Sequence, residues 1–379
     1  MVGPVRNNAN GTRSTRPSTT AEQDALAVLG RRLTRTVDMW WSGGDVVATG
    51  KEMDAMTDDE LLAEMRESAV GKKARAIILV DHINTWEPGF FERLNRAGPH
   101  TAAAARDAKT QLNDGQSNGR SEDARKVREV MPKWRSWSPP LGDRLSRGLG
   151  HPECAKFLAP PTLDFDNEEV ANKFVNDGEP AMTPEVWGSY MWAEGKFDRQ
   201  HPSVGMLDGE LLHLAASAIL FSPSSSIPET IQAAGGARGL TRRRGPIGLA
   251  KKYNMQEVNP AFIAYVACVT RHALTTPKNF SEVCDGFSYT KFYYLVRNVL
   301  ESPKYQCWAK GLIARWNEKL FAGYEFGLNA VTPTDQPNAI LNLLDAELEG
   351  LEMTGENMGL GSEGDPRVLR AAELVETTG

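Results

Sequence analysis

The residues best suited to chemistry are the basic residues of the segment Ala237–Lys252, which contains no acid and has three glycines among its cations. Those cations are Arg238, Arg242, Arg243, Arg244, Lys251 and Lys252. Guanidinium groups bind phosphate through paired hydrogen bonds, and each neutralised phosphate adds salt-dependent affinity. We therefore predict a flexible loop that contacts nucleic acid without reading its base sequence.

Two other interpretations of this segment stay open. It is also typical of a solvated loop between two helices, and Arg242–Arg244 has the composition of a nuclear-import signal. The stretch Gly245–Lys252 has a superficial likeness to a phosphate loop, but its spacing is wrong and no hydroxyl residue follows the lysine. A nucleoside-triphosphate site is therefore not expected.

A catalytic alternative uses two acids and two histidines, Asp164, Asp166, His213 and His272. Carboxylates in this arrangement can bind a divalent cation or transfer protons, and the function would then be that of a hydrolase or transferase. Such acids are more often found at the N-terminus of a helix, where negative charge is favoured. The alternative requires a pocket in which at least two of the four groups meet, and no catalytic residue is assigned.

Four residues have the side chains of a zinc site, namely His151, Cys154, Cys268 and His272. They form two pairs far apart in the sequence, and Cys268 lies on an apolar helix face, where a small core residue is the commoner case. We predict no metal and no cofactor. The four cysteines of the chain lack paired spacing, which indicates reduced thiols.

The elements that must position these residues are helices. Asn259-Pro260 and Thr183-Pro184 each combine an N-cap with proline at the first helical position, and an apolar stripe recurs every three or four residues from Tyr305 to Phe321. About six such helices and no long alternating strand predict a mainly α, orthogonal multi-helix core domain over residues 122–322.

The flanks differ from this core. Residues 1–20 are predicted to be disordered, and 21–96 to form an N-terminal helical extension, a candidate oligomerisation element, with a capping box at Thr57-Asp58-Asp59-Glu60. Residues 97–121, rich in Ala, Asn, Asp, Gly and Ser, are predicted to be a linker. Residues 323–379 are predicted to be a flexible acidic tail with a short amphipathic helix that docks on a protein partner or on its own core.

The charge of the chain is unevenly distributed. Its net charge is -6, and residues 332–379 hold ten acids and two arginines, a balance of -8, so the other residues sum to +2. The body of the chain can therefore attract an anionic partner. No apolar run approaches the roughly 18 residues of a membrane span and the first 21 residues are polar, so we expect an intracellular protein, cytoplasmic or nuclear.

Several short motifs of a known family are found in this chain, in the same order as in that family. They are Arg147-Gly148-Leu149-Gly150-His151-Pro152, Asp177-Gly178 to Trp187, Phe221-Ser222-Pro223-Ser224-Ser225, Ile263–Ala267 with Arg271 and Leu274, Phe292-Tyr293, and Trp316-Asn317. With these motifs the chain resembles an uncharacterised domain family that is abundant in mushroom-forming fungi. The resemblance implies a domain boundary and a fungal origin, and it supplies no catalytic residue.

The leading hypothesis is a non-enzymatic interaction protein that binds nucleic acid or chromatin through the basic segment. The acidic tail would compete for the same cations. The hydrolase or transferase is one alternative, and an oligomeric scaffold that assembles through residues 21–96 is another.

Overall fold

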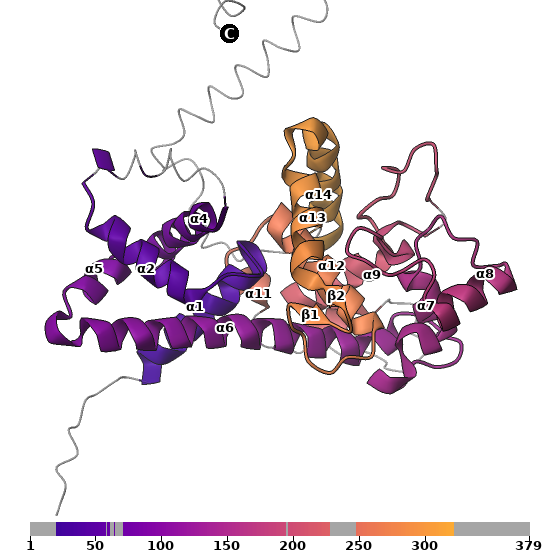
Figure 1. Cartoon of the computed structure of the whole chain (residues 1–379), viewed down its shortest axis with the longest axis horizontal. Coiled ribbons are helices and arrows are strands. Elements are labelled where there is room, and N and C mark those ends of the chain that lie inside the picture. The colour runs from indigo at the N-terminus through magenta and orange to yellow at the C-terminus, as the bar shows by residue number, and fades with distance from the viewer. Residues whose placement is uncertain are drawn as a thin grey trace, which may run out of the picture. The chain divides into compact units, whose positions relative to one another are not determined.

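The fold is assembled on one long helix, α6 (Thr101–Val130). Helices α1, α2 and α5 contact it, as do α9 and α12, and Figure 1 shows it running beneath both groups. The predicted linker over residues 97–121 is therefore wrong. Four consecutive alanines from Ala102 favour helix, and Gly115, which suggested a break, lies where any side chain would collide with the backbone of Ala27 on α1.

The computed structural model describes residues 20–57, 59–60, 64, 71–194, 196–227 and 248–321. The predictions for residues 1–19 and for the tail from 323 onward lie outside these residues. The other α-helices are α1 (Thr20–Thr36), α2 (Gly43–Asp54), α4 (Gly71–Trp86), α5 (Phe90–Asn95), α7 (Pro152–Leu158), α8 (Glu168–Asn172), α9 (Glu210–Leu220), α11 (Leu249–Lys252), α12 (Pro260–Leu274), α13 (Tyr289–Glu301) and α14 (Gln306–Phe321).

Short helical turns connect several of these helices. They are η1 (Gly98–His100), η2 (Met131–Lys133), η3 (Arg144–Ser146), η4 (Gly148–Gly150), the π-type turn η5 (Lys173–Asp177), η6 (Ser189–Met191), η7 (Pro223–Ser226) and η8 (Pro303–Tyr305). Within the described ranges, the one sheet pairs β1 (Val283–Cys284) with β2 (Phe287–Ser288), antiparallel, with Val283 opposite Ser288. The mainly α fold class predicted from the sequence is confirmed.

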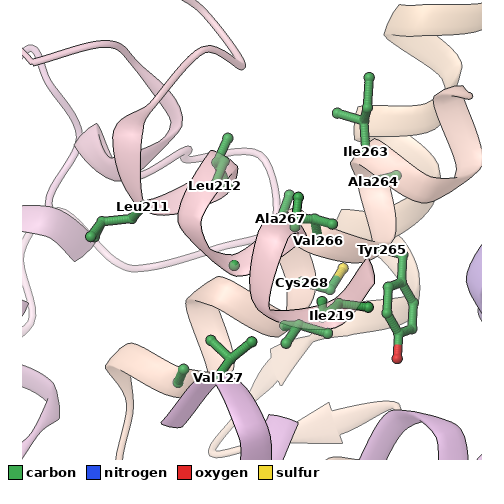
Figure 2. Packing of buried hydrophobic residues seen from close by; sticks show 14 of the residues in the cluster. Val127, Leu211, Leu212, Ile219, Ile263, Ala264, Tyr265, Val266, Ala267 and Cys268 are labelled. Atoms are coloured by element: carbon green, nitrogen blue, oxygen red, sulfur yellow. The ribbon is translucent and has the colours of Figure 1, made fainter. Parts of the chain in front are cut away.

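The larger of two hydrophobic cores surrounds α12, in which every residue from Ala261 to Leu274 is buried. The predicted cap is present, because the Asn259 side chain accepts the N–H of Phe262 and Pro260 opens the helix. Figure 2 shows Ile219 and Leu212 beside Val266 and Cys268, with Val127 of α6 close by. Each Å² of apolar surface that is removed from water contributes about 25 cal/mol to stability. The larger core is therefore the main stabilising element of the fold.

The smaller core lies between α1, α2, α4, α5 and the first half of α6. The run Ala76–Val80, whose period left helix and strand undecided, lies in α4 and buries Leu79 and Val80. The capping box is confirmed, since the Thr57 N–H donates to Glu60 Oε2 at 2.9 Å and the Glu60 N–H donates to Thr57 Oγ1.

The N-terminal helices pack directly on the larger core. Arg297 of α13 donates to the backbone oxygen of Val37 at 2.9 Å, and Tyr294 donates to the Asp38 carboxylate at 3.0 Å. All described residues fall in one compact unit that ends at Gly323. The segment 21–96 is thus joined to the core by polar contacts as well as by α6, and its proposed role in oligomerisation stays a prediction.

Two further helix predictions have different outcomes. No helix begins at Thr183-Pro184, where the chain forms a turn before the short η6. The stripe of α14 is confirmed, with Leu312, Trp316 and Leu320 buried, whereas Tyr305 precedes the helix and is 41% exposed. Among the described helices, none has the length and apolar character that crossing a membrane requires.

Candidate anion-binding site

The structure describes two of the six predicted site residues, Lys251 and Lys252, which form the last turn of α11. Both are exposed, and within the described residues neither forms an ion pair with a carboxylate. The others, Arg238, Arg242, Arg243 and Arg244, lie outside the described residues, so the geometry of the segment is known only at its C-terminal end.

Tyr253 fixes this end of the segment against α1. Its side chain is 6% exposed, its hydroxyl accepts Nη1 of Arg35 at 2.9 Å, and its backbone oxygen accepts Nη2 of Arg32 at 3.2 Å. Gly248, the N-cap residue of α11, is in close contact with the backbone of Leu220 and Phe221, where a side chain would clash. The two lysines are therefore held in place by packing on both sides.

Lys252 lies at a cleft of about 510 Å³, here called the Lys252 cleft. Its walls come from α1, α5 and α6 and include the apolar side chains Leu26, Phe90 and Leu94. The cations Arg32 and Arg93 and the acids Glu87 and Asp107 also line it. The cleft is thus largely apolar, with charged groups among its lining residues.

Arg32 is the best-placed partner of Lys252 in this cleft. Its guanidinium carbon lies 3.6 Å from the centre of the Trp86 ring, and burial lowers its pKa. Arg93, by contrast, is neutralised by Glu87 at 2.7 Å. Because Arg32 has no carboxylate partner among the described residues, Arg32 and Lys252 together offer positive charge beside an aromatic ring.

The Lys252 cleft also contains an unused hydrogen-bond acceptor. Oε1 of Gln111 is buried and has no partner in the described chain. A buried amide oxygen without a donor costs free energy, so a ligand that brings an N–H or O–H group would be favoured there. The cleft can therefore hold an anionic group at Lys252 and a flat or apolar body against its walls.

The catalytic alternative is divided between separate places. Asp164 and Asp166 line another cleft of about 560 Å³, where Lys156 pairs with Asp166 at 3.1 Å, and neither histidine lines it. Nε2 of His213 donates to Asp208 Oδ1 at 2.6 Å, next to Lys319. The cap of helix α8 beside these acids is Asn167, which accepts the N–H groups of Glu169 and Val170.

His272 lies in the core. Its ring stacks on Phe280 at 4.4 Å, both ring nitrogens are buried without hydrogen-bond partners, and burial, with nearby Arg128 and Arg271, lowers its pKa to about 3. The structure therefore does not bring the two acids together with either histidine.

The four zinc-type residues have structural roles. Nδ1 of His151 accepts the N–H of Cys154 at 3.3 Å and so caps α7, while Nε2 lies 2.8 Å from the backbone oxygen of Pro139. The Cys268 thiol is buried and faces the backbone oxygen of Tyr289. In the part of the chain that the structure describes, no three His, Cys, Asp or Glu side chains gather as a metal would require.

Sequence reasoning missed Arg32, Trp86 and Gln111. Arg31 and Arg32 are adjacent arginines on the same helix, and Trp86, the aromatic partner of Arg32, is distant in the sequence. Only the packing of α1 against α4 and against Tyr253, the residue after α11, distinguishes Arg32 from Arg31. No pattern in the sequence indicates a cleft at this position.

The fold and these sites define a mainly α-helical protein in which positive charge borders an apolar cleft. The chain belongs to a family of unknown function, DUF6698, whose model matches residues 114–321. The match begins inside α6 and ends with α14, so the Lys252 cleft combines family residues with the preceding N-terminal helices. No curated protein and no solved structure matches the chain.

Proposed function

We propose that the protein is a non-enzymatic interaction protein that binds nucleic acid through the basic segment and the adjoining Lys252 cleft. The observation that carries the proposal is the pair of exposed, unpaired lysines on α11, one of which borders a cleft containing Arg32 stacked on Trp86. Protein groups within this cleft offer both of the interactions that single-stranded nucleic acids use, cation contact and stacking.

The chemistry predicts strong salt dependence and little base preference. Phosphate contacts carry no sequence information, and each one neutralised lowers the slope of log K against log salt by roughly 0.7 to 0.9. The cleft, at about 510 Å³, has the volume to accept one unstacked base. We therefore favour single strands over duplex as the ligand.

The proposal extends to parts of the chain outside the described residues. The tail from 323 onward, with its excess of acids, would compete with nucleic acid for the same cations or dock on a protein partner. An intracellular, cytoplasmic or nuclear location and a fungal origin belong to the same proposal, as does self-association through residues 21–96.

Fluorescence anisotropy with single- and double-stranded probes at low salt tests the nucleic-acid proposal. The full chain is compared with K251A/K252A, with R242A/R243A/R244A and with the control K133A/K310A, which removes two exposed lysines elsewhere. We expect both site variants to bind at least about tenfold more weakly, since each phosphate contact adds affinity. The control and the wild-type chain should bind alike.

Two outcomes would overturn this function. One is an absence of binding at tens of micromolar protein, unchanged when residues 332–379 are deleted. The other is equal weakening in the control and the site variants, which would show a general effect of net charge rather than a site.

A further inference from the structure

A third cleft, of about 720 Å³, lies beside the C-terminal ends of α6 and α12 and is lined by five cations and two acids. The cations are Arg125, Arg128, Arg144, Arg147 and Lys278, and the acids are Glu129 and Asp143. It is here called the Arg147 cleft. Every residue that lines it lies between Ser117 and Phe280, inside the family match.

The two acids are already occupied. Glu129 pairs with Arg125 at 2.8 Å, and Asp143 accepts the N–H groups of Leu145 and Ser146 as the cap of η3. Within the described residues, the remaining four cations of the cleft form no ion pair with a carboxylate. Asp143 keeps its negative charge, which acts on Arg147, but the cations of the lining outnumber the acids, so the Arg147 cleft carries an excess of positive charge.

Backbone oxygens hold three of these cations in place. Arg147 donates to Ala273 at 2.7 Å, Arg128 to His272 at 3.1 Å, and Arg144 to Thr276 at 3.2 Å. These acceptors lie at the end of α12 and in the following turn, so the arginines also stabilise the helix C-terminus. A helix C-terminus carries only about half a negative charge, so most of the positive charge of three guanidinium groups is left over.

Burial makes this arrangement costly without a ligand. Arg147 is 3% exposed, and Nε of Arg147 and of Arg128 are both buried with no hydrogen-bond partner. Burial and the neighbouring Arg128 lower the pKa of Arg147 to about 10, and burial and Arg144 lower that of Arg128. Desolvated like charges that lie close together favour an anion that supplies the opposite charge.

We propose that the Arg147 cleft binds a phosphate-bearing small molecule, with Arg144 and Lys278 contacting the phosphate oxygens and the buried guanidinium group of Arg147, held by the backbone oxygens of Ala273 and Arg128, adding positive charge behind them. A phosphate or diphosphate group has the multiple charges and acceptor oxygens that several guanidinium donors require, which a single carboxylate lacks. Ser117, Ser121 and Asn279 add neutral polar groups to the lining, and Phe280 adds an aromatic one. This site does not depend on the nucleic-acid proposal, because it shares no residue with the Lys252 cleft or the basic segment.

Calorimetric titration of the full chain at constant ionic strength tests the site, with inorganic phosphate, pyrophosphate and ADP as probes and acetate as the singly charged control. The variants are Arg144→Gln and Lys278→Ala, whose side chains are half-buried and exposed, and the matched control is Lys310→Ala. We expect saturable pyrophosphate binding, one per chain, that weakens about tenfold or more in both variants. Lys310→Ala and acetate should show no such effect.

The comparison of ADP with pyrophosphate distinguishes an organic phosphate from an inorganic phosphate as the ligand. Tighter binding of ADP than of pyrophosphate supports an organic phosphate that uses the aromatic lining, and equal binding supports recognition of the phosphate alone. No saturable binding of any phosphate probe up to about 10 mM, or equal binding by wild type, Arg144→Gln and Lys278→Ala, would overturn the proposal.

Two further variants keep the result interpretable. Arg147→Lys keeps the buried charge, so it should bind pyrophosphate nearly as tightly as the wild type does while circular dichroism shows an intact fold. The variant R242A/R243A/R244A should lose nucleic-acid binding and retain pyrophosphate binding. A chain that fails to bind nucleic acid but binds pyrophosphate would contradict only the nucleic-acid proposal. A chain that fails to bind pyrophosphate but binds nucleic acid would contradict only the proposal for the Arg147 cleft.

Discussion

Arg35 of α1 and Asp123 of α6 form a buried ion pair, with 2.6 Å between Nε and Oδ2 and side-chain exposures of 2% and 0%. Asp123 also accepts the Tyr265 hydroxyl of α12 at 2.9 Å, and Arg35 donates to the Tyr253 hydroxyl beyond α11. One ion pair thus connects the N-terminal helices, the long helix and the central helix of the core. Tyr253, which follows Lys252 directly, is held by this network through its hydroxyl.

Replacing one partner of this pair should strongly destabilise the fold. Asp123→Ala leaves the buried Arg35 guanidinium with only the partly exposed carboxylate of Glu122, 3.8 Å away, and losing one partner of a buried pair typically costs about 3–5 kcal/mol. Urea denaturation followed by circular dichroism measures the loss. Glu129→Ala, which breaks the exposed pair with Arg125, is the matched control and should cost no more than about 0.5 kcal/mol. Equal losses in the two variants would show that the buried pair is not structurally important.

The crossing of α1 and α6 should not tolerate a methyl group at Gly115. A Cβ there would collide with the backbone oxygen of Ala27, and backbone cannot move aside as a side chain can. Gly115→Ala should therefore lower the free energy of unfolding by about 1–3 kcal/mol, despite the better helix propensity of alanine. Gly150→Ala is the control, because a Cβ at Gly150 meets nothing within 4 Å. Thermal unfolding of both variants tests this prediction. An unchanged unfolding midpoint for Gly115→Ala would contradict the close approach of α1 and α6 at this glycine.

Local sequence signals predicted the elements that have local causes. Asn259-Pro260 fixes the start of α12 through its own cap, and the spacing of Leu312, Trp316 and Leu320 fixes the buried face of α14. The helix over 101–121 was missed because glycines usually interrupt a helix, whereas Gly115 is required by a neighbouring helix that is distant in the sequence.

The candidate sites show the same division. The cations of the basic segment are adjacent in sequence and were identified from composition. Arg128, Arg147 and Lys278 are separated along the chain and meet only when α6 packs against the end of α12. Sequence spacing cannot reveal which arginines lack a carboxylate partner, because that depends on which acids, such as Glu129, are used elsewhere.

A fragment limited to the family match should fold poorly. A chain of residues 114–321 begins inside α6 and lacks α1, so Asp123 would lose Arg35 and the α1-facing side of α6 would be exposed. We expect it to aggregate or unfold at lower urea than a chain of residues 20–321, which keeps both cores. Size-exclusion chromatography and urea denaturation of the two fragments compare them. A monomeric 114–321 fragment of equal stability would show that the N-terminal helices are dispensable.

The stability of the protein should fall in mild acid because of His272. Its folded pKa of about 3 is well below the ordinary value of about 6.5, so between these values the unfolded chain binds a proton that the folded chain excludes. Stability from this group is complete above pH 6.5 and is lost as the pH falls toward 3, by up to about 1.4 kcal/mol for each pH unit. Between pH 7.5 and 5 the loss should approach about 2 kcal/mol.

His272→Phe isolates this effect, since phenylalanine keeps an aromatic ring against Phe280 and cannot take a proton. Urea denaturation at several pH values from 7.5 to 5 should show a shallower pH dependence for the variant than for the wild type. His213, whose pKa burial also lowers, contributes with the same sign in both proteins and cancels from the difference. The control His201→Ala removes an exposed histidine and should leave the slope unchanged. If His272→Phe and His201→Ala both keep the wild-type slope, the buried imidazole takes up its proton without unfolding the core.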